Sequence, residues 1–119
     1  MKKLLSVFCV TLLTMTGCAT PTAADLERAD YGFYPTDFES TIRAHLRSQL
    51  KDPDSAQISF LNSPKSGWYA LGGLKYGYVV CAQINSKNSF GAYVGYRPAY
   101  FMIRNDAVID FSLGDGNYG

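Results

Sequence analysis

Residues 1–17 of the 119-residue sequence limit how much of the chain is left to form a folded domain. Lys2 and Lys3 precede an apolar segment at 4–13 (LLSVFCVTLL), and small residues follow it up to Cys18. A positive start, a short apolar segment and small residues before a cleavage point are typical of a secretory signal peptide. A helix that spans a membrane needs about 20 apolar residues, more than this segment supplies. We therefore predict that residues 1–17 are a signal peptide and that the rest of the chain is exported.

Residues 15–18 (MTGC) resemble the lipobox of bacterial lipoproteins, whose cysteine is lipidated and becomes the first residue of the mature chain. The resemblance implies that Cys18 carries lipid and anchors the protein to a membrane. Ala19 stands where an Asp would resemble an inner-membrane retention signal. The resemblance therefore implies the outer membrane, with the domain in the periplasm or at the cell surface. Cleavage at another position, which would give a protein without lipid, is the alternative.

The composition of residues 18–119 indicates one small domain of nearly neutral charge. Two lysines leave with the signal peptide, so nine of the eleven basic residues remain against ten acidic ones. This balance provides no electrostatic reason to bind nucleic acid. Cys81 is the one thiol left once Cys9 is removed and Cys18 is lipidated. We expect Cys81 to be buried, as cysteines often are; an intermolecular disulfide and a reactive thiol are the alternatives.

Residues 18–35, which begin with the lipidated Cys18, are predicted to form a flexible tether, because they contain two prolines and no sustained apolar period. The aromatic residues near the end of this tether are expected to dock on the domain. Residues 36–50 are predicted to form a helix with Thr36 and Glu39 as its capping box. Apolar residues recur in this helix at steps of three and four, and Pro53 follows its end.

The rest of the chain is predicted to consist of strands and turns. Residues 75–85 alternate between two faces and give the strongest strand pattern. The expected strands are 57–61, 67–71, 75–85, 99–104 and 107–111, the last two joined by a turn at Asn105-Asp106. Short strands with tight turns favour an antiparallel sheet, and one helix covers one face of it. We therefore predict an α+β domain at 36–119, with one N-terminal helix packed on a small antiparallel sheet.

The sequence offers few residues for catalysis or metal binding. His45 and Cys81 are the available pair of base and nucleophile, and a Cys-dependent hydrolase needs both within hydrogen-bonding distance. A cysteine in the middle of a strand lacks the exposed, electropositive setting that lowers a thiol pKa. One histidine and one free cysteine do not make a zinc site. We therefore expect no enzyme activity, no metal and no cofactor.

One polar loop is predicted to be an interaction surface. It directly follows the strongest strand and places amide, ammonium and hydroxyl groups beside two aromatic rings. Its candidate residues are Asn85, Lys87, Asn88, Phe90 and Tyr93. The alternative is a hairpin connection whose Asn and Ser side chains bond their own backbone. The many aromatic residues of the strand region either pack across strands or form a binding face for sugar or peptide.

Residues 50–56 (LKDPDSA) and 80–95 (VCAQINSKNSFGAYVG) resemble two blocks found in a group of small exported bacterial proteins. That group shows a DPDSA turn followed by a Cys-Gly-x-Val-Asn-x-Lys-Asn-Ser-Phe-Gly-Gly-Tyr block. Ala82 and Ala92 stand where the pattern of the group has glycine. The resemblance covers about residues 36–111 and implies no particular activity.

These observations lead us to expect a non-enzymatic lipoprotein of the outer membrane, a binding or structural accessory module of the bacterial cell envelope. Its expected partners are the membrane, through the lipid on Cys18, and an unidentified envelope protein or glycan. A first alternative is a protein that uses an aromatic face to bind cell-wall glycan. The same face could instead bind an attacking enzyme, as in a lysozyme inhibitor. A second alternative is a hydrolase that depends on Cys81 and His45.

Overall fold

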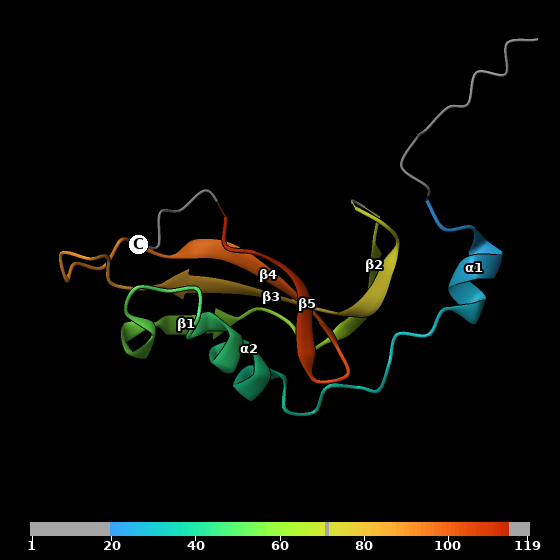
Figure 1. Cartoon of the computed structure of the whole chain (residues 1–119), viewed down its shortest axis with the longest axis horizontal. Coiled ribbons are helices and arrows are strands. Elements are labelled where there is room, and N and C mark those ends of the chain that lie inside the picture. The colour runs from blue at the N-terminus through green and yellow to red at the C-terminus, as the bar shows by residue number, and fades with distance from the viewer. Residues whose placement is uncertain (1–19, 71, 115–119) are drawn as a thin grey trace, which may run out of the picture.

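The computed structural model describes residues 20–70 and 72–114 (Figure 1). The predicted signal peptide, the predicted lipidation site Cys18 and residues 115–119 lie outside the described residues. The described chain forms a five-stranded antiparallel sheet with two α-helices, which confirms the predicted α+β fold. Neither of these helices, nor any other in the described part, has the length and apolar character to span a membrane.

The sheet is built around its longest strand, β3 (Lys75–Asn85). On one edge, β3 pairs with β4 (Arg97–Arg104), which pairs in turn with β5 (Ala107–Ser112). The other edge of β3 is shared by β1 (Gln57–Phe60) and β2 (Lys65–Tyr69), which pair with different halves of the strand. All of these pairings are antiparallel, and each predicted strand is present within two residues of its predicted ends.

The side chain of Asn62 fills the gap between β1 and β2 along the edge of β3. Its Nδ2 donates to the carbonyl of Val79 at 3.0 Å, and its Oδ1 accepts from the backbone N–H of Cys81 at 2.8 Å. A side-chain amide has the same donor and acceptor as a peptide unit. Asn62 therefore completes the hydrogen bonding of β3 at the point where the chain has left β1 and has not yet entered β2.

Helix α2 (Phe38–Leu46) packs on one face of the sheet. Ile42 and Leu46 are fully buried, and the turns after the helix bury Leu50 as well. Successive side chains of a strand point to opposite faces, so every second residue of β3 and β4 faces the helix. The core consists of Ile42, Leu46, Leu50, Val80, Ala82, Ile84, Ala99, Phe101 and Ile103. The predicted packing of one helix on the sheet is confirmed.

The predicted capping box of this helix is wrong. The helix begins at Phe38 with Asp37 as its N-cap, and the Asp37 side chain makes no capping hydrogen bond. Glu39 is then the second helical residue, whereas a capping box needs the acidic residue at the third position. Thr36 lies outside the helix and is exposed. The helix also ends earlier than predicted, because residues 47–50 continue as separate hydrogen-bonded turns.

Strand β3 bends strongly near β2 (Figure 1), and Gly77 permits the close packing of strands at this bend. A Cβ atom on Gly77 would lie 2.8 Å from the carbonyl oxygen of Ile103 and 2.9 Å from the side chain of Met102. The turn between β4 and β5 has positive φ at both Asn105 and Asp106, 51° and 59°. A two-residue type I′ turn requires this conformation, so the predicted hairpin is confirmed.

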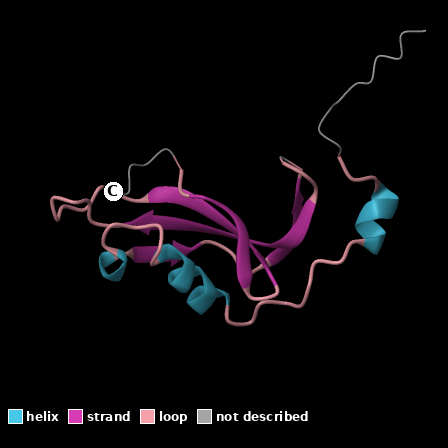
Figure 2. Cartoon of the chain, viewed as in Figure 1, coloured by secondary structure: helices cyan, strands magenta, loops and turns pink. Residues whose placement is uncertain are grey.

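The part of the predicted tether that the structure describes, residues 20–35, is here called the N-terminal arm. It contains the short helix α1 (Ala23–Arg28), while the rest of the arm is loop (Figure 2). After α1, the arm runs along the sheet, where the ring of Tyr31 packs on Tyr76 and Tyr78 at centroid distances of 5.7 and 6.3 Å. The expected docking of the aromatic residues is therefore present, and the packed part of the chain begins before residue 36.

Candidate functional site

The predicted interaction loop lies beyond the end of the sheet that is remote from α1 (Figure 1). It joins β3 to β4, and residues 86–96 are here called the tip loop. An antiparallel bridge between Lys87 and Tyr93 closes its base, and the backbone N–H of Val94 donates to the carbonyl of Ser86. The tip loop is therefore a closed, hairpin-like extension of the two central strands.

Asn88 fixes the turn at the end of the tip loop. Its Oδ1 accepts from the backbone N–H of Phe90 at 2.9 Å and from that of Ala92 at 3.2 Å. Its backbone N–H donates to the carbonyl of Ala92 at 2.9 Å, and its carbonyl accepts from the N–H of Gly91 at 3.0 Å. Gly91 has a φ of 78°, which glycine adopts without strain. Four hydrogen bonds at one residue thus define the turn.

Two segments that are distant in the sequence meet at the base of the tip loop. The 3-10 turn η1 (Pro53–Ser55) lies beside it. Ser55 accepts through its Oγ from the backbone N–H of Lys87 and through its carbonyl from the hydroxyl of Tyr93, both at 3.1 Å. Residues 50–56 and 80–95, the two blocks singled out in the sequence, therefore contact each other at this end of the sheet.

Phe90 has 93% of its surface exposed, more than any other large apolar residue of the described chain. Burying a Phe side chain contributes about 1.5–3 kcal/mol, which the isolated domain forgoes at this position. Tyr93 and Tyr96, in the same loop, are 45% and 54% exposed. The hydrogen bonds of the turn use only the backbone of Phe90, so the turn itself does not require an aromatic ring there.

The structure separates the roles of the five predicted residues. Phe90 and Tyr93 are exposed, as expected for a contact surface. Asn85 and Asn88 use their side chains to hold loop backbone, so for these two the alternative interpretation of a self-bonded hairpin is correct. Lys87 is half-buried, with its ammonium 5.5 Å from the centre of the Tyr93 ring.

Two serines of this site were not predicted. Ser55 lies in a segment that the sequence identifies only as a turn. Ser86 is fully buried, and its Oγ has no hydrogen-bond partner among the described residues. Ser86 extends the buried series Val80, Ala82 and Ile84 by one more step of two. The period of the strand could therefore have identified Ser86 as buried, whereas no sequence pattern predicts the contacts of Ser55.

The expectation that Cys81 is buried is wrong, because its side chain is exposed. Its neighbours Val80 and Ala82 face the core under α2, so Cys81 points to the opposite face of the sheet. Neither helix of the described chain is part of that face. The sequence of β3 is apolar on both faces in this region, and only the position of the helix decides which face is buried.

The sheet separates Cys81 from His45. The His45 ring packs on Phe111, with 4.4 Å between centroids, and near Phe101 on the core side. Burial in these apolar surroundings lowers the pKa of His45. The predicted alternative of a Cys81–His45 pair is therefore not assembled in this structure. Within residues 20–70 and 72–114, no cluster of three or more metal-binding side chains is present.

The face that carries Cys81 contains a shallow apolar hollow of about 320 Å³. Leu61, Pro98 and Tyr100 contribute to its lining. Burial raises the pKa of Tyr100 to about 12, and the nearby Asp110 carboxylate adds to this effect. Among the described residues, the lining of the hollow contains no Asp, Glu, Lys, Arg or His, so it is a neutral surface.

The aromatic residues of the strand region do not form one binding face. Tyr76 and Tyr78 contact the N-terminal arm, and Phe101 is buried in the core. Tyr69 and Tyr100 approach each other on the face opposite α2. Packing between neighbouring elements accounts for these five residues, whereas Trp68 of β2 is 40% exposed and the tip loop retains exposed rings.

Comparison of the chain with protein-family models, with curated proteins and with solved structures finds no match. The description of the protein therefore comes from its structure. It is a small α+β domain, and a fixed hairpin loop extends from one end of its sheet.

Proposed function

We propose that this protein is a non-enzymatic lipoprotein of the bacterial outer membrane, and that it binds an envelope protein through the tip loop. The observation that carries the proposal is the presentation of Phe90, an almost fully exposed ring on a turn whose backbone is fixed. The sequence of residues 1–18 supports the export and the membrane anchor.

The fixed conformation of the tip loop favours binding. Asn88 holds the backbone of Phe90 and Ala92 before a partner arrives, so binding loses little conformational entropy. A partner with an apolar pocket recovers the hydrophobic free energy of the exposed Phe90 ring. Removing such an interface anchor costs about 2 kcal/mol or more of binding free energy.

The position of the tip loop fits a protein that is anchored by its N-terminus. The N-terminal arm leaves the domain at one end of the sheet, and the tip loop extends from the other (Figure 1). A lipid on Cys18 would keep α1 near the bilayer. The tip loop would then point away from the membrane, where it can reach a partner in the envelope.

Crosslinking in intact envelopes tests the proposed contact. A photoreactive phenylalanine replaces Phe90 in one strain and Leu61 in a control strain, because Leu61 is also exposed, at 57%, but lies by the hollow on the sheet. We expect a specific crosslinked protein from position 90 and not from position 61. Phe90→Ala should weaken capture of this partner at least tenfold, which corresponds to about 1.4 kcal/mol.

Two results would contradict the proposed contact. One is the same set of crosslinked proteins from both positions, and the other is unchanged capture by Phe90→Ala. Leu61→Ala serves as the matched control and should leave capture unchanged. The lipid anchor has a separate test: Cys18→Ser should leave the precursor uncleaved and without palmitate, and labelling of this variant would refute the anchor.

The exposed rings of Tyr93 and Tyr96 support a second candidate function, the binding of cell-wall glycan. Tyrosine offers a flat apolar surface with a polar end, which suits a sugar. Crosslinking from position 90 distinguishes the candidates, because a glycan partner would give products that cell-wall hydrolases release and proteases do not.

A further inference from the structure

A cleft of about 560 Å³ lies between the N-terminal arm and the nearby end of the sheet. The cleft is open to solvent, and α1, which forms one of its sides, has no buried residues. Arg28 of α1 and Lys75 of β3 line it from opposite elements, and Leu74 and Ile109 add apolar surface. The cleft is far from the tip loop and has a different chemical character.

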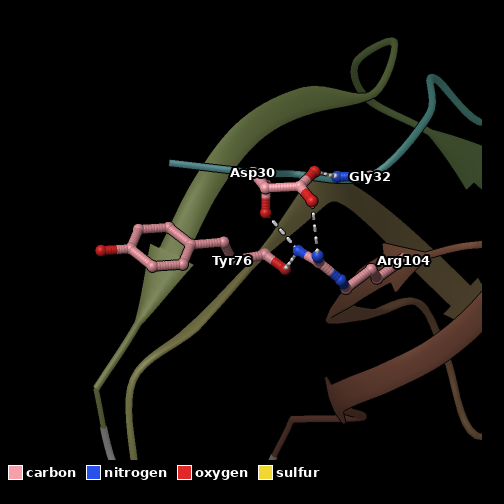
Figure 3. Close-up of polar contacts among 4 residues, drawn as sticks. All are labelled: Asp30, Gly32, Tyr76 and Arg104. Carbon is pink, nitrogen blue, oxygen red and sulfur yellow. Dashed lines mark hydrogen bonds and ion pairs between the residues drawn. The ribbon is translucent and has the colours of Figure 1, made fainter. Parts of the chain in front are cut away.

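Arg104 lines this cleft. Its polar contacts hold the arm on the sheet (Figure 3). Its guanidinium donates to the carbonyls of Asp30 and Tyr76 and lies 3.4 Å from the Asp30 carboxylate. The same carboxylate accepts from the N–H of Gly32 at 2.8 Å. Arg104 and Asp30 are therefore engaged with each other and with backbone.

The second acidic side chain of the cleft, Asp25, is also held by local donors. Its carboxylate accepts from the backbone N–H of Thr22 at 2.9 Å, and this backbone hydrogen bond lowers the pKa of Asp25. By contrast, Arg28 and Lys75 form no ion pair within the part of the chain that the structure describes. The cleft thus has three cationic side chains against two carboxylates, and two of the cations are available to a ligand.

We propose that this cleft binds the phosphate group of an anionic phospholipid. Arg28 and Lys75 supply the charge-assisted hydrogen bonds that a phosphate accepts. Leu74, which is 42% exposed, and Ile109 contact the glycerol and the first methylenes of the lipid. Basic and apolar side chains together are typical of surfaces that bind anionic membranes.

The inference rests on the proposed membrane location of the protein. Asp25, at the wall of the cleft, is seven residues from Cys18, a separation of at most about 25 Å even in an extended chain. A lipid on Cys18 therefore keeps the cleft within reach of the phospholipid headgroups. Phospholipid in the cleft would bind the domain to the bilayer at a second point.

The test uses the full-length protein, purified from membranes in a neutral detergent. The fluorescence of Trp68, the one tryptophan of the chain, reports binding, because Trp68 pairs with Tyr76 of the cleft across β2 and β3. The titrants are short-chain phosphatidylglycerol, short-chain phosphatidylcholine and glycerol phosphate. We expect saturable binding of phosphatidylglycerol and at least about tenfold weaker binding of the other two.

The variant with Arg28→Gln and Lys75→Gln should bind phosphatidylglycerol about tenfold or more weakly than the natural protein. The control with Arg47→Gln and Lys51→Gln has the same change in charge at exposed residues outside the cleft, and its affinity should change less than about twofold. Arg28→Gln alone, on the surface of α1, should show a smaller loss and leaves Lys75 in the sheet intact.

Each of the other outcomes would overturn the inference. Equal losses in both double variants would mean non-specific attraction between charges. Equal binding of phosphatidylcholine would exclude selection for an anionic headgroup, and equal binding of glycerol phosphate would indicate a free phosphate compound rather than a lipid. Failure of Phe90 to capture a partner would leave these results unaffected, so the cleft and the tip loop are tested independently.

Discussion

The two ends of the sheet hold their extensions by different means. The tip loop is held by polar groups, because Asn88 and Ser55 bond its backbone while Phe90 stays exposed. The N-terminal arm is held by aromatic rings, with Tyr31 and Tyr34 packed on the tyrosines of β3, and by the guanidinium of Arg104 bound to Asp30. The two extensions thus differ in how they use an aromatic ring: Phe90 of the tip loop stays exposed, whereas Tyr31 of the arm packs on the sheet.

This difference underlies the different ligands that we propose for the two ends. A loop whose backbone is satisfied by its own polar side chains leaves its apolar ring available to a partner. The arm packs the ring of Tyr31 on the sheet, and beside it Arg28 of α1 and Lys75 of β3 form no ion pair among the described residues. We therefore propose a partner with an apolar pocket for the tip loop and an anion for the cleft beside the arm.

The largest expected effect of a substitution concerns the arm. Tyr31→Ala removes a half-buried ring and two ring contacts, so we expect a loss of about 2–3 kcal/mol in the free energy of unfolding. Urea unfolding measures the loss, and limited proteolysis should cut the arm faster. Phe33→Ala is the control, because Phe33 lies on the same arm and is 55% exposed. Equal losses in both variants would show that ring packing does not hold the arm.

The next effect concerns the tip loop. Asn88→Ala removes the acceptor for the N–H groups of Phe90 and Ala92, so we expect a loss of about 1–2 kcal/mol in urea unfolding. Asn88→Asp keeps an acceptor at this position and should recover most of the loss. Capture of the envelope partner should fall with Asn88→Ala, because Phe90 is no longer held. If the Asn88→Ala variant is destabilised but captures the partner as before, binding does not depend on the fixed conformation of the tip loop.

A smaller effect concerns the core that both ends share. Burial lowers the pKa of His45 below its ordinary value of 6.5, so the folded protein binds fewer protons than the unfolded chain. The free energy of unfolding should therefore decrease as pH falls from about 6.5 through the lowered pKa. His45→Gln should make this dependence shallower when unfolding is compared at pH 7.5 and pH 5. An identical pH dependence in the variant would contradict the assigned cause.

The smallest effect is expected where the ring is most exposed. Phe90→Ala should change the free energy of unfolding by less than about 0.5 kcal/mol, since the turn uses only the backbone of Phe90. Thermal melts of Phe90→Ala and Tyr31→Ala, measured side by side, compare the tip loop with the arm most directly. A large loss from Phe90→Ala would mean that the ring packs on the domain, and the contrast between the two ends would not hold.

The sequence predicts the sheet well because the information is local. The alternation in β3 and the Asn105-Asp106 turn each act within a few residues, and both are present in the structure. The helix was predicted from the same kind of pattern, but its first turn was placed wrongly. The capping box of Thr36 and Glu39 satisfied a spacing rule, while the structure starts the helix two residues after Thr36.

The site is less predictable, because it depends on contacts between distant segments. The loop was identified from its composition, but the contact of Ser55 with Lys87 joins residues on two separate turns. The exposure of Cys81 depends on which face of the sheet α2 covers, and a strand that is apolar on both faces does not contain that information. The cleft was not predicted, since it forms only when the arm lies against the sheet.

Asn62 has a consequence for how this sheet avoids unwanted association. An unpaired stretch of strand edge can pair with a strand from another molecule and start aggregation. Between β1 and β2, the carbonyl of Val79 and the N–H of Cys81 would form such a stretch, and one side chain occupies both. Asn62 thereby protects the edge of β3 at a point where no strand pairs with it. The chain can therefore turn from β1 to β2, and the edge of β3 stays closed to a second molecule.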